Sequence, residues 1–254
     1  MRTSWHSSLA FTALIVAGLL LNPAIIGTVL AEQPGSKQEQ TPESDSDAGP
    51  ESQPESEGAS AETAAEFVEG VHFVRLAEPV PTINPDRIEV IEAFSYGCPY
   101  CYELETSIMR WEHQVPSYVD FRRLHAVWNE PMRLYAQAFY AAIHMGIIDS
   151  IHVATFNAVQ IEQRRLASPR AFADFAGERG YDRDDYIRHF RSAETRQAVE
   201  MSEQRVQSYG ISGVPQFIVN GKYRVDPARA DGREAMLDVV DFLIAREREA
   251  MKQD

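Results

Sequence analysis

Hydrophobic and polar residues divide this chain into three stretches of different character. Residues 1–31 carry a single charge, Arg2, followed by an apolar run over residues 9–21. Residues 32–66 contain no aromatic or branched apolar residue. From Phe67 onward, apolar residues recur at the spacings typical of strands and helices. The pattern therefore predicts one globular region behind two segments of a different kind.

The globular region opens with two β-type runs, at 72–76 and 87–94, and the second is apolar enough for a central strand. A helix is expected to begin at Pro99, because proline suits the first helical turn, where its missing N–H costs nothing. A third strand is expected over 118–128. These elements predict the start of an α/β sheet.

A helical block follows over residues 131–210, with no strand pattern inside it. Breaks are expected at Gly146, at Ser168-Pro169 and at Gly180, and Gly210 provides a C-terminal stop. The block is therefore predicted to contain three or four helices.

After the block, Asn220-Gly221 lies between two β-rich runs, which is a strong signal for a hairpin. An amphipathic helix over 232–250 closes the pattern. Without the helical block, the order is β-β-α-β-β-β-α. We therefore predict an α/β domain built from residues 67–130 and 211–254, interrupted by an all-helical insertion.

The first 31 residues have the parts of a secretory signal: a basic start, an apolar core that ends at Asn22-Pro23, and small residues up to Ala31. An uncleaved membrane anchor is the alternative, because a helix that continues past Pro23 could reach the ~20 residues of a span. No cysteine stands directly after the apolar core, which excludes a lipoprotein anchor. The leader predicts export to a periplasm, and the alternative is attachment to the inner membrane through the uncleaved leader.

Residues 32–66 hold ten acidic residues and one lysine. So little apolar surface cannot offset the entropy lost on ordering, so we expect a disordered acidic linker. The linker carries −9 of the net charge of −14, and residues 67–254 carry −6 once the +1 of the leader is counted. This mild acidity without a basic patch argues against a nucleic-acid partner.

The two cysteines of the chain, Cys98 and Cys101, stand in the stretch FSYGCPYCYELE. A bridge between them closes a loop too small to stabilise the fold, so the pair is expected to serve chemistry. Cys98 follows a strand and precedes a helix, where backbone N–H groups and the helix dipole stabilise a thiolate. Cys101, one turn further along, would be less exposed and able to attack a mixed disulfide on Cys98.

A metal site is the main alternative use of a C-x-x-C pair. Structural zinc needs four ligands, and the sequence has no second cysteine pair, no H-x-x-x-H pair and no histidine within ten residues of the cysteines. Coincidental packing is the remaining alternative. We therefore predict a redox-active dithiol that needs neither metal nor cofactor.

The stretch ISGVPQFIVNGKY places Pro215 directly before a strand, where proline cannot donate to the ladder and a cis peptide bond is a natural solution. Together with the cysteine loop, this pattern resembles the thioredoxin fold, in which a cis-proline loop faces the dithiol. With its helical insertion, the chain from about Phe67 to its end resembles the DsbA family of periplasmic thiol-disulfide oxidoreductases. The leader and the linker lie outside the resemblance.

The resemblance implies a thioredoxin fold with an inserted all-helical domain, and roles for single residues. Cys98 would be the exposed nucleophile and Cys101 its buried partner, with Pro215 as the cis-proline. Val214 would present its backbone to a bound peptide strand. Glu92 would be a buried acid that helps protons move beneath the disulfide, whereas without the resemblance a solvent-facing strand position is favoured.

Pro99 and Tyr100, between the cysteines, are expected to tune the pair, and Tyr100 departs from the family pattern. Typical members have a histidine there, which stabilises the thiolate by charge or hydrogen bonding, whereas tyrosine offers at most a neutral O–H. We therefore expect a weaker oxidant than the strongest members, since about 30 mV of potential corresponds to about 1.4 kcal/mol. The departure leaves the net direction of exchange open.

Other candidate residues near the site are assigned to packing. His125, on the third strand, could approach the cysteines, but a hydrogen-bonded structural histidine is favoured. Trp128, Tyr135, Phe139 and Tyr140 could line a peptide groove, but their helical spacing favours core packing.

The predicted function is that of an exported, monomeric oxidoreductase that introduces disulfide bonds into reduced client proteins. A DsbB-like membrane quinone oxidoreductase is implied for reoxidation by the resemblance alone. One alternative uses the same site as a reductase or isomerase, although isomerases of this class usually need a dimerisation domain and none is visible. The other is a non-catalytic peptide-binding chaperone, which would keep its activity in a Cys98→Ser variant.

Overall fold

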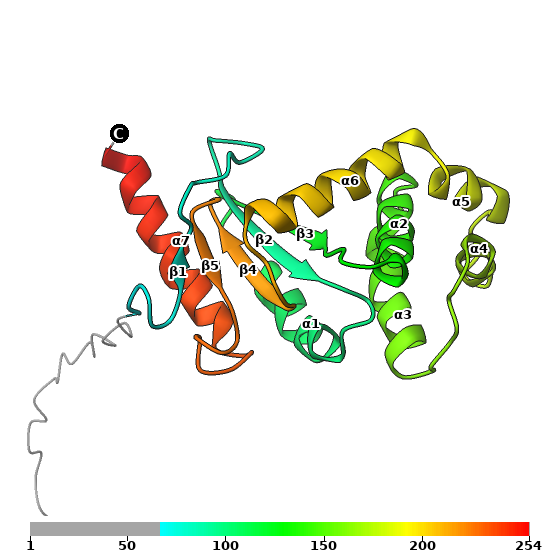
Figure 1. The fold of residues 1–254 in the computed structure, drawn as a ribbon, viewed down its shortest axis with the longest axis horizontal. Coiled ribbons are helices and arrows are strands. Elements are labelled where there is room, and N and C mark those ends of the chain that lie inside the picture. The colour runs from blue at the N-terminus through cyan, green and yellow to red at the C-terminus, as the bar shows by residue number, and fades with distance from the viewer. Residues whose placement is uncertain (1–66, 254) are drawn as a thin grey trace, which may run out of the picture. The chain divides into compact units, whose positions relative to one another are not determined.

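The computed structural model describes residues 67–253, so the predictions for the leader and the acidic linker lie outside the described residues. Residues 67–253 form seven helices and five strands, and the elements outside the helical block follow one another in the predicted order (Figure 1). The elements outside the helical block are β1 (Val74–Arg75), β2 (Ile88–Phe94), α1 (Pro99–Glu112), β3 (Val119–His125), β4 (Gln216–Val219), β5 (Tyr223–Val225) and α7 (Met236–Gln253). No helix within 67–253 is long and apolar enough to cross a membrane.

The five strands form one sheet in the order β1-β5-β4-β2-β3. β2 pairs in parallel with β3, and every other neighbouring pair is antiparallel. All seven residues of β2 are buried, as expected for a central strand covered on both faces. This mixed sheet agrees with the predicted α/β class.

Two predicted strands are shorter than expected. The run at 72–76 gives only the two residues of β1, and β3 ends at His125 rather than at Trp128. β2, the partner of β3, ends at Phe94, whose carbonyl accepts a last hydrogen bond from the Ala126 N–H at 2.8 Å. Beyond that point the strand has no partner, so the chain leaves the sheet toward the helical block.

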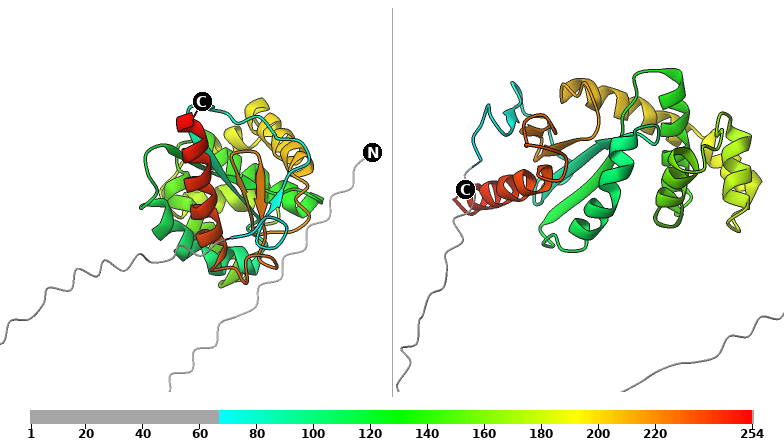
Figure 2. Two further views of the ribbon diagram at one scale, coloured as in Figure 1. Left: turned by 90° about the vertical axis from the view of Figure 1, so that its left-hand side faces the viewer. Right: turned by 90° about the horizontal axis from the view of Figure 1, so that it is seen from below.

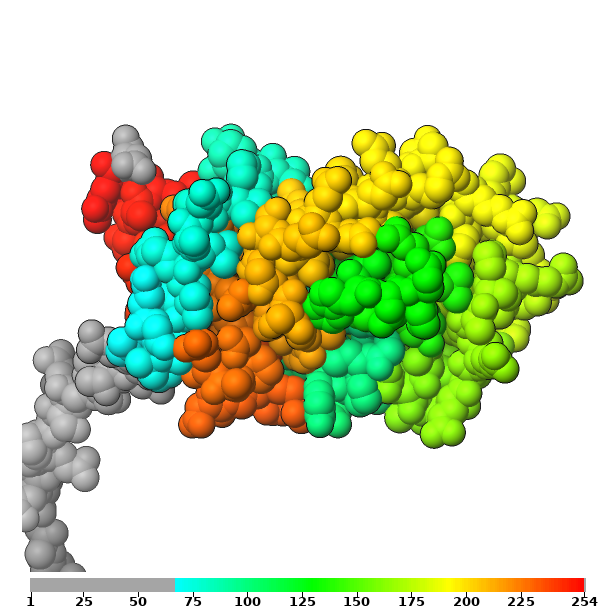
Figure 3. Space-filling model, in the orientation of Figure 1, coloured from blue at the N-terminus to red at the C-terminus, as the bar shows by residue number. Residues whose placement is uncertain are grey.

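Helices cover both faces of the sheet. Leu104 and Ile108 of α1 share one apolar cluster with Val240 and Leu243 of α7. The opposite face packs against the end of helix α6 (Ala193–Ser208) through Val206. The view from below in Figure 2 shows α1 and α7 on one side of the strands and α6 on the other. In Figure 3, α6 runs in gold from the helical block across to the sheet.

The helical block contains five helices, so the prediction of three or four is wrong. They are α2 (Glu130–His144), α3 (Ile148–Gln160), α4 (Pro169–Gly177), α5 (Arg183–Phe190) and α6. The break that the sequence analysis missed lies at Arg191–Ser192. There the Ser192 hydroxyl accepts a hydrogen bond from the Thr195 N–H at 3.1 Å and caps α6.

The β4–β5 hairpin forms where it was predicted. Asn220 and Gly221 have φ values of 51° and 61°, the left-handed conformation that this tight turn needs. A Cβ at Gly221 would collide with the carbonyl of Val80, so glycine is required there. The hairpin holds β4 in register beside β2, and Pro215 lies directly before β4.

Candidate active site

Cys98 occupies the N-cap of α1. The buried strand β2 ends at Phe94, and a three-residue loop carries the chain to Cys98. The Cys98 sulfur accepts a hydrogen bond from the backbone N–H of Cys101 at 3.1 Å. Pro99 begins the helix, and Cys98 is half-buried whereas Cys101 is fully buried.

The two thiols have opposite acidities. A hydrogen bond from the Cys101 thiol, with the backbone N–H groups of Cys101 and Tyr100, lowers the pKa of Cys98 to about 7 against the opposing effect of burial. Burial, with the charge of the neighbouring thiolate, raises the pKa of Cys101 far above its ordinary range. Near neutral pH, a large fraction of Cys98 is therefore ionised to an accessible thiolate, whereas Cys101 stays a protonated thiol.

The loop before β4 lies against Cys98. The Val214–Pro215 peptide bond is cis, and Pro215 is buried. The Cys98 thiol donates to the Val214 carbonyl over a sulfur–oxygen distance of 3.5 Å. The cysteine loop and the proline loop, over a hundred residues apart in the chain, thus meet at one place.

Tyr100 is 55 % exposed beside the cysteines, and an arginine accompanies it. The Arg233 guanidinium lies 4.6 Å from the centre of the Tyr100 ring and pairs with Glu103 at 2.5 Å. The positive charge of Arg233 is among the causes that lower the pKa of Cys98, after the hydrogen bonds. A positive charge therefore stabilises the Cys98 thiolate, although Pro99 and Tyr100 between the cysteines carry no charge.

Glu92 lies in β2, fully buried, so the solvent-facing alternative is wrong and the burial implied by the resemblance is observed. Its partner in the parallel register is Arg123 of β3, with 3.4 Å between Arg123 Nε and Glu92 Oε2. Burial, followed by the charge of Glu105, raises the pKa of Glu92 to about 8. Glu92 is therefore a protonated acid at neutral pH.

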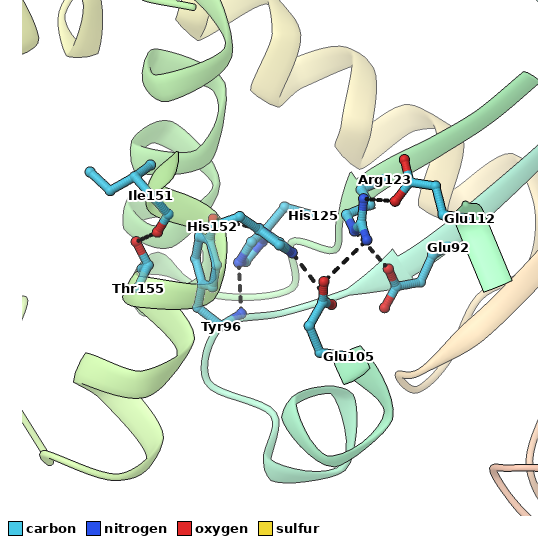
Figure 4. Close-up of polar contacts among 9 residues, drawn as sticks. All are labelled: Glu92, Tyr96, Glu105, Glu112, Arg123, His125, Ile151, His152 and Thr155. Atoms are coloured by element: carbon cyan, nitrogen blue, oxygen red, sulfur yellow. Dashed lines mark hydrogen bonds and ion pairs between the residues drawn. The ribbon is translucent and has the colours of Figure 1, made fainter. Parts of the chain in front are cut away.

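Figure 4 shows how this ionic network continues away from the sheet. Arg123 also contacts Glu105 of α1 at 3.1 Å and Glu112 at 3.0 Å. Burial alone would raise the pKa of Glu105, but the contacts with His152 and Arg123 outweigh it and lower that pKa. The Nε2 atom of His152 in α3 lies 3.5 Å from Glu105 Oε2.

His125 is a hydrogen-bonded structural histidine, as predicted. Its Nε2 accepts from the Tyr96 N–H at 3.2 Å, and its Nδ1 lies 2.9 Å from the Ala126 carbonyl, to which it donates. Burial lowers the pKa of His125 to about 3, so the ring is neutral. Its contact with Tyr96 nevertheless holds the loop that carries Cys98.

A family model described as the DSBA-like thioredoxin domain matches residues 123–238. The thiol:disulfide interchange protein DsbA of Pseudomonas aeruginosa is 36 % identical over 193 residues, which span 76 % of this chain and 92 % of that protein. The corresponding protein of Pseudomonas syringae pv. tomato is 38 % identical over 195 residues, 77 % of this chain and 91 % of the relative.

This chain belongs to the DsbA family. Among solved structures, that of Pseudomonas aeruginosa DsbA is similar with a TM-score of 0.71 at 36 % identity, covering 73 % of this chain and 97 % of the other. The oxidoreductase NmDsbA1 from Neisseria meningitidis gives a TM-score of 0.65 at 27 % identity, covering 74 % and 97 %. The predicted thioredoxin fold with an inserted helical domain and the predicted class of enzyme, a thiol-disulfide oxidoreductase, are confirmed.

Within this DsbA-family fold, the aromatic cluster behaves only in part as predicted. Phe139 is buried, and Tyr135 and Tyr140 pack against buried residues. Trp128 is 44 % exposed, so its assignment to the core is wrong. Ala126 and Val127, which follow β3, are still buried, and Trp128 is the exposed residue directly before Asn129, the N-cap of α2.

The sequence analysis missed four residues around the site: Glu105, Arg123 and His152 of the ionic network, and Arg233 beside Tyr100. Glu105 had a usable signal, because it follows Cys101 by four residues and so lies on the same buried face of α1. The other three are brought in by tertiary structure. Among residues 67–253, no three His, Cys, Asp or Glu side chains gather as metal ligands would.

Proposed function

We propose that this DsbA-family protein introduces disulfide bonds into reduced client proteins, with the Cys98–Cys101 disulfide as the oxidant. The observation that carries the proposal is the contact of the Cys98 sulfur with the N–H of Cys101 at the start of α1. This contact stabilises Cys98 as a thiolate, and a stabilised thiolate is a good leaving group. The reduced form of the pair is favoured, so the disulfide tends to be passed on.

The exchange proceeds in two displacements. A client thiolate attacks the Cys98 sulfur, the Cys98–Cys101 bond breaks, and Cys101 leaves as a thiolate while a mixed disulfide forms on Cys98. A second client thiolate then attacks the client sulfur of that mixed disulfide. The client disulfide forms and Cys98 leaves as a thiolate, so two electrons pass from the client to the cysteine pair.

Other residues have supporting roles in this proposal. Glu92 protonates the buried Cys101 thiolate, for which a carboxyl with a pKa of about 8 is suited. Val214 offers backbone hydrogen bonds to a client strand beside Cys98, and Pro215 holds the loop that presents them. Pro99 and Tyr100 border the thiolate and tune its stability.

The wider setting belongs to the same proposal. An exported, monomeric protein would work in the periplasm on reduced exported clients. It would be free in the periplasm if the leader is cleaved, or attached to the inner membrane if the leader is retained. A DsbB-like membrane quinone oxidoreductase would reoxidise the pair. Residues 67–130 and 211–254 would form the catalytic domain, and the insertion at 131–210 would cover one side of it.

The decisive measurement is the redox equilibrium of the Cys98–Cys101 pair in glutathione buffers, with the reduced fraction read by thiol trapping. A potential above about −180 mV supports disulfide donation, because the pair then oxidises client thiols. A value below about −230 mV contradicts it and favours the reductase alternative.

A pair of variants tests whether the chemistry resides in the cysteines. Cys98→Ser is expected to abolish oxidation of a reduced client. Cys101→Ser, mixed with a client that carries a disulfide, is expected to accumulate a mixed disulfide, because the Cys98 thiolate attacks the client disulfide, one client thiolate leaves, and no Cys101 thiol is present to resolve the product. If Cys98→Ser still prevents client aggregation and the wild type shows no exchange, the chaperone alternative holds instead.

A further inference from the structure

A tight turn carries the chain from β2 to Cys98. The N–H of Cys98 donates to the carbonyl of Ser95 at 3.0 Å, so residues 95–98 form a β-turn with Tyr96 and Gly97 at its centre. The peptide group between Tyr96 and Gly97 can point either way in such a turn. The second orientation needs a left-handed residue after it, which glycine supplies at no steric cost. Gly97 is not left-handed here, so the structure shows one of two orientations that this sequence permits.

Two hydrogen bonds hold the Tyr96–Gly97 peptide group in the observed orientation. At one end, the Gly97 N–H donates to the Ser95 hydroxyl at 3.3 Å. At the other end, the Tyr96 carbonyl accepts from Nε2 of Gln160 at 2.6 Å. Gln160 is the last residue of α3, so this contact comes from the inserted domain. Because Tyr96 is buried, water cannot readily replace the Gln160 amide as a donor.

Other contacts of α3 with this region join side chains only. In Figure 4, the ring of Tyr96 lies beside α3, and its hydroxyl is 2.9 Å from Nδ1 of His152. The Tyr102 hydroxyl of α1 donates to Asn157 Oδ1 at 2.8 Å. Gln160, in contrast, acts on the backbone of the turn. It is therefore the residue of α3 that is placed to fix the peptide group.

We propose that Gln160 is a positioning residue that fixes the Tyr96–Gly97 peptide group and so holds the Cys98 sulfur against the N–H of Cys101. The inference rests on the proposed function and adds a residue of the inserted domain to it. A peptide group that is free to turn over lets the backbone shift at Cys98, where the turn ends. A hydrogen bond weakens steeply as its angle departs from linear. The 3.1 Å contact between the Cys101 N–H and the Cys98 sulfur therefore depends on a rigid turn.

The contact with the Cys101 N–H stabilises the thiolate of Cys98 more than the thiol. Loss of Gln160 should therefore matter only where Cys98 is ionised. With a pKa of about 7 for Cys98, the thiolate predominates at pH 8 and the thiol at pH 6. A weaker contact should raise this pKa, so the reduced form should lose stability at pH 8 and not at pH 6.

The titratable and charged groups around Cys98 are the same with and without the Gln160 amide. Cys101 of α1 and Glu92 of β2 carry a proton near neutral pH, and Arg233, before α7, is positively charged. The proline loop 211–215 has no titratable side chain. A neutral substitution of Gln160 leaves these charges unchanged, so their effects cancel in a comparison with the wild type. The same holds for the surrounding aromatic cluster, which adds the imidazole of His152 and the hydroxyls of Tyr96, Tyr102, Tyr135 and Tyr140.

The test measures the equilibrium of the full chain with glutathione at pH 6 and at pH 8, in the wild type and in Gln160→Met. The reduced fraction is read by thiol trapping. Methionine is about as long as glutamine but donates no hydrogen bond. Asn157→Leu is the matched control, because Asn157 lies one turn earlier in α3 and its hydrogen bond goes to Tyr102 of α1 rather than to the turn.

We expect Gln160→Met to match the wild type at pH 6. At pH 8 its equilibrium constant for the oxidation of glutathione should be about threefold lower, which corresponds to a rise of about 0.5 in the pKa of Cys98. Asn157→Leu should match the wild type at both pH values.

Three results would each overturn the inference: equal constants for the wild type and Gln160→Met at pH 8, an equal loss at both pH values, or the same loss in Asn157→Leu. A wild-type pair that is a weaker oxidant than glutathione disulfide at pH 8 would instead contradict the proposed function. The ratio between the wild type and Gln160→Met would still test the inference in that case.

A rescue variant tests whether Gln160 acts through the peptide group. Gly97→Ala introduces a residue that resists the left-handed conformation needed for the opposite orientation. The added Cβ would lie 3.4 Å from the Tyr135 ring and 3.8 Å from the Ser95 hydroxyl, so the site has room for it. Combined with Gln160→Met, Gly97→Ala should therefore restore most of the loss at pH 8. A double variant that is as weak an oxidant as Gln160→Met alone would contradict the inference.

Discussion

The reactivity of Cys98 depends on a small number of neighbours. Hydrogen bonds from Cys101 and its backbone act directly on the sulfur, and the charge of Arg233 acts from the side of Tyr100. The sequence placed Cys98 at a helix start and identified Tyr100 as a departure from the family pattern. It could not identify Arg233, because no local pattern connects Arg233 with Tyr100, which lies 133 positions earlier in the chain.

Because Arg233 lies beside Tyr100, substitutions of Arg233 and of its partner Glu103 should shift the pKa of Cys98 in opposite directions. Arg233→Gln removes a cation near the thiolate, so the pKa of Cys98 should rise and the pair should become a weaker oxidant. Glu103→Gln removes the anion that pairs with Arg233 at 2.5 Å. The pKa of Cys98 should therefore fall in this variant, and the pair should become a stronger oxidant. Because both side chains are partly exposed, each effect should be small, on the order of 10 mV.

The ultraviolet absorbance of the thiolate, titrated against pH, measures the pKa of Cys98 in each variant, and glutathione equilibria give the potential. Tyr100→Phe serves as the control, because it keeps the ring under Arg233 and removes only the hydroxyl. Shifts of the same sign in Arg233→Gln and Glu103→Gln would show that the charge of Arg233 does not act on Cys98.

At the scale of elements, local signals predicted most of the fold. Asn220-Gly221 predicted the hairpin and Pro99 the start of α1, and the glycine breaks predicted the ends of α2, α4 and α6. Errors occurred where a tertiary partner decides the boundary. β3 ends at His125 because β2 ends at Phe94, and nothing within the β3 segment itself marks that end.

A buried carboxylate holds the hairpin against the last helix. Glu247 of α7 accepts hydrogen bonds from Asn220 Nδ2 and Lys222 Nζ, both at 2.6 Å. Glu247→Ala leaves these donors without their partner and should lower the free energy of unfolding by about 1–3 kcal/mol. Urea unfolding of the wild type and of Glu247→Ala measures this difference, as a lower midpoint with the same dependence of the unfolding free energy on urea concentration.

Glu247→Gln is the matched control for that variant. An amide retains one acceptor oxygen but loses the negative charge, so its loss of stability should be smaller than that of Glu247→Ala. An unchanged urea midpoint in Glu247→Ala would show that the turn residues and the sheet hold the hairpin without help from α7.

At the scale of the whole molecule, the site joins residues from four parts of the chain. Glu92 lies in β2, Arg123 in β3, Glu105 in α1 and His152 in α3. The sequence alone identified the cysteines, because both stand in one short motif. The family resemblance was needed for the burial of Glu92. The contact of His152 with Glu105 depends on how the inserted helices pack against α1, and no periodicity in the sequence encodes that packing.

The acidities of the two cysteines predict how the oxidation state changes the stability of the whole fold. Folding lowers the pKa of Cys98 from 9.0 to about 7. Between these values, the folded reduced protein binds fewer protons than the unfolded chain, so its stability rises with pH. This contribution is complete above about pH 9 and is lost as the pH falls through 7.

Folding raises the pKa of Cys101 instead, so the reduced protein should lose stability again above about pH 9. The oxidised protein has neither thiol to titrate, whereas Glu92 and His125 are present in both forms. The difference in unfolding free energy between the reduced and oxidised proteins should therefore increase from pH 7 to a maximum near pH 9. Since one pKa unit is about 1.4 kcal/mol and Cys98 is only half-buried, we expect an increase of about 1–2 kcal/mol.

Urea unfolding of both forms at a series of pH values measures this difference, with reductant present for one form and absent for the other. Reduced Cys98→Ala provides the control, because it lacks the thiolate and its stability should not rise between pH 7 and pH 9. If the reduced and oxidised proteins differ by a constant amount across that interval, the fold does not stabilise the Cys98 thiolate. The driving force for disulfide donation would then have to come from strain in the oxidised form, because the helix start that holds Cys98 would contribute nothing to it.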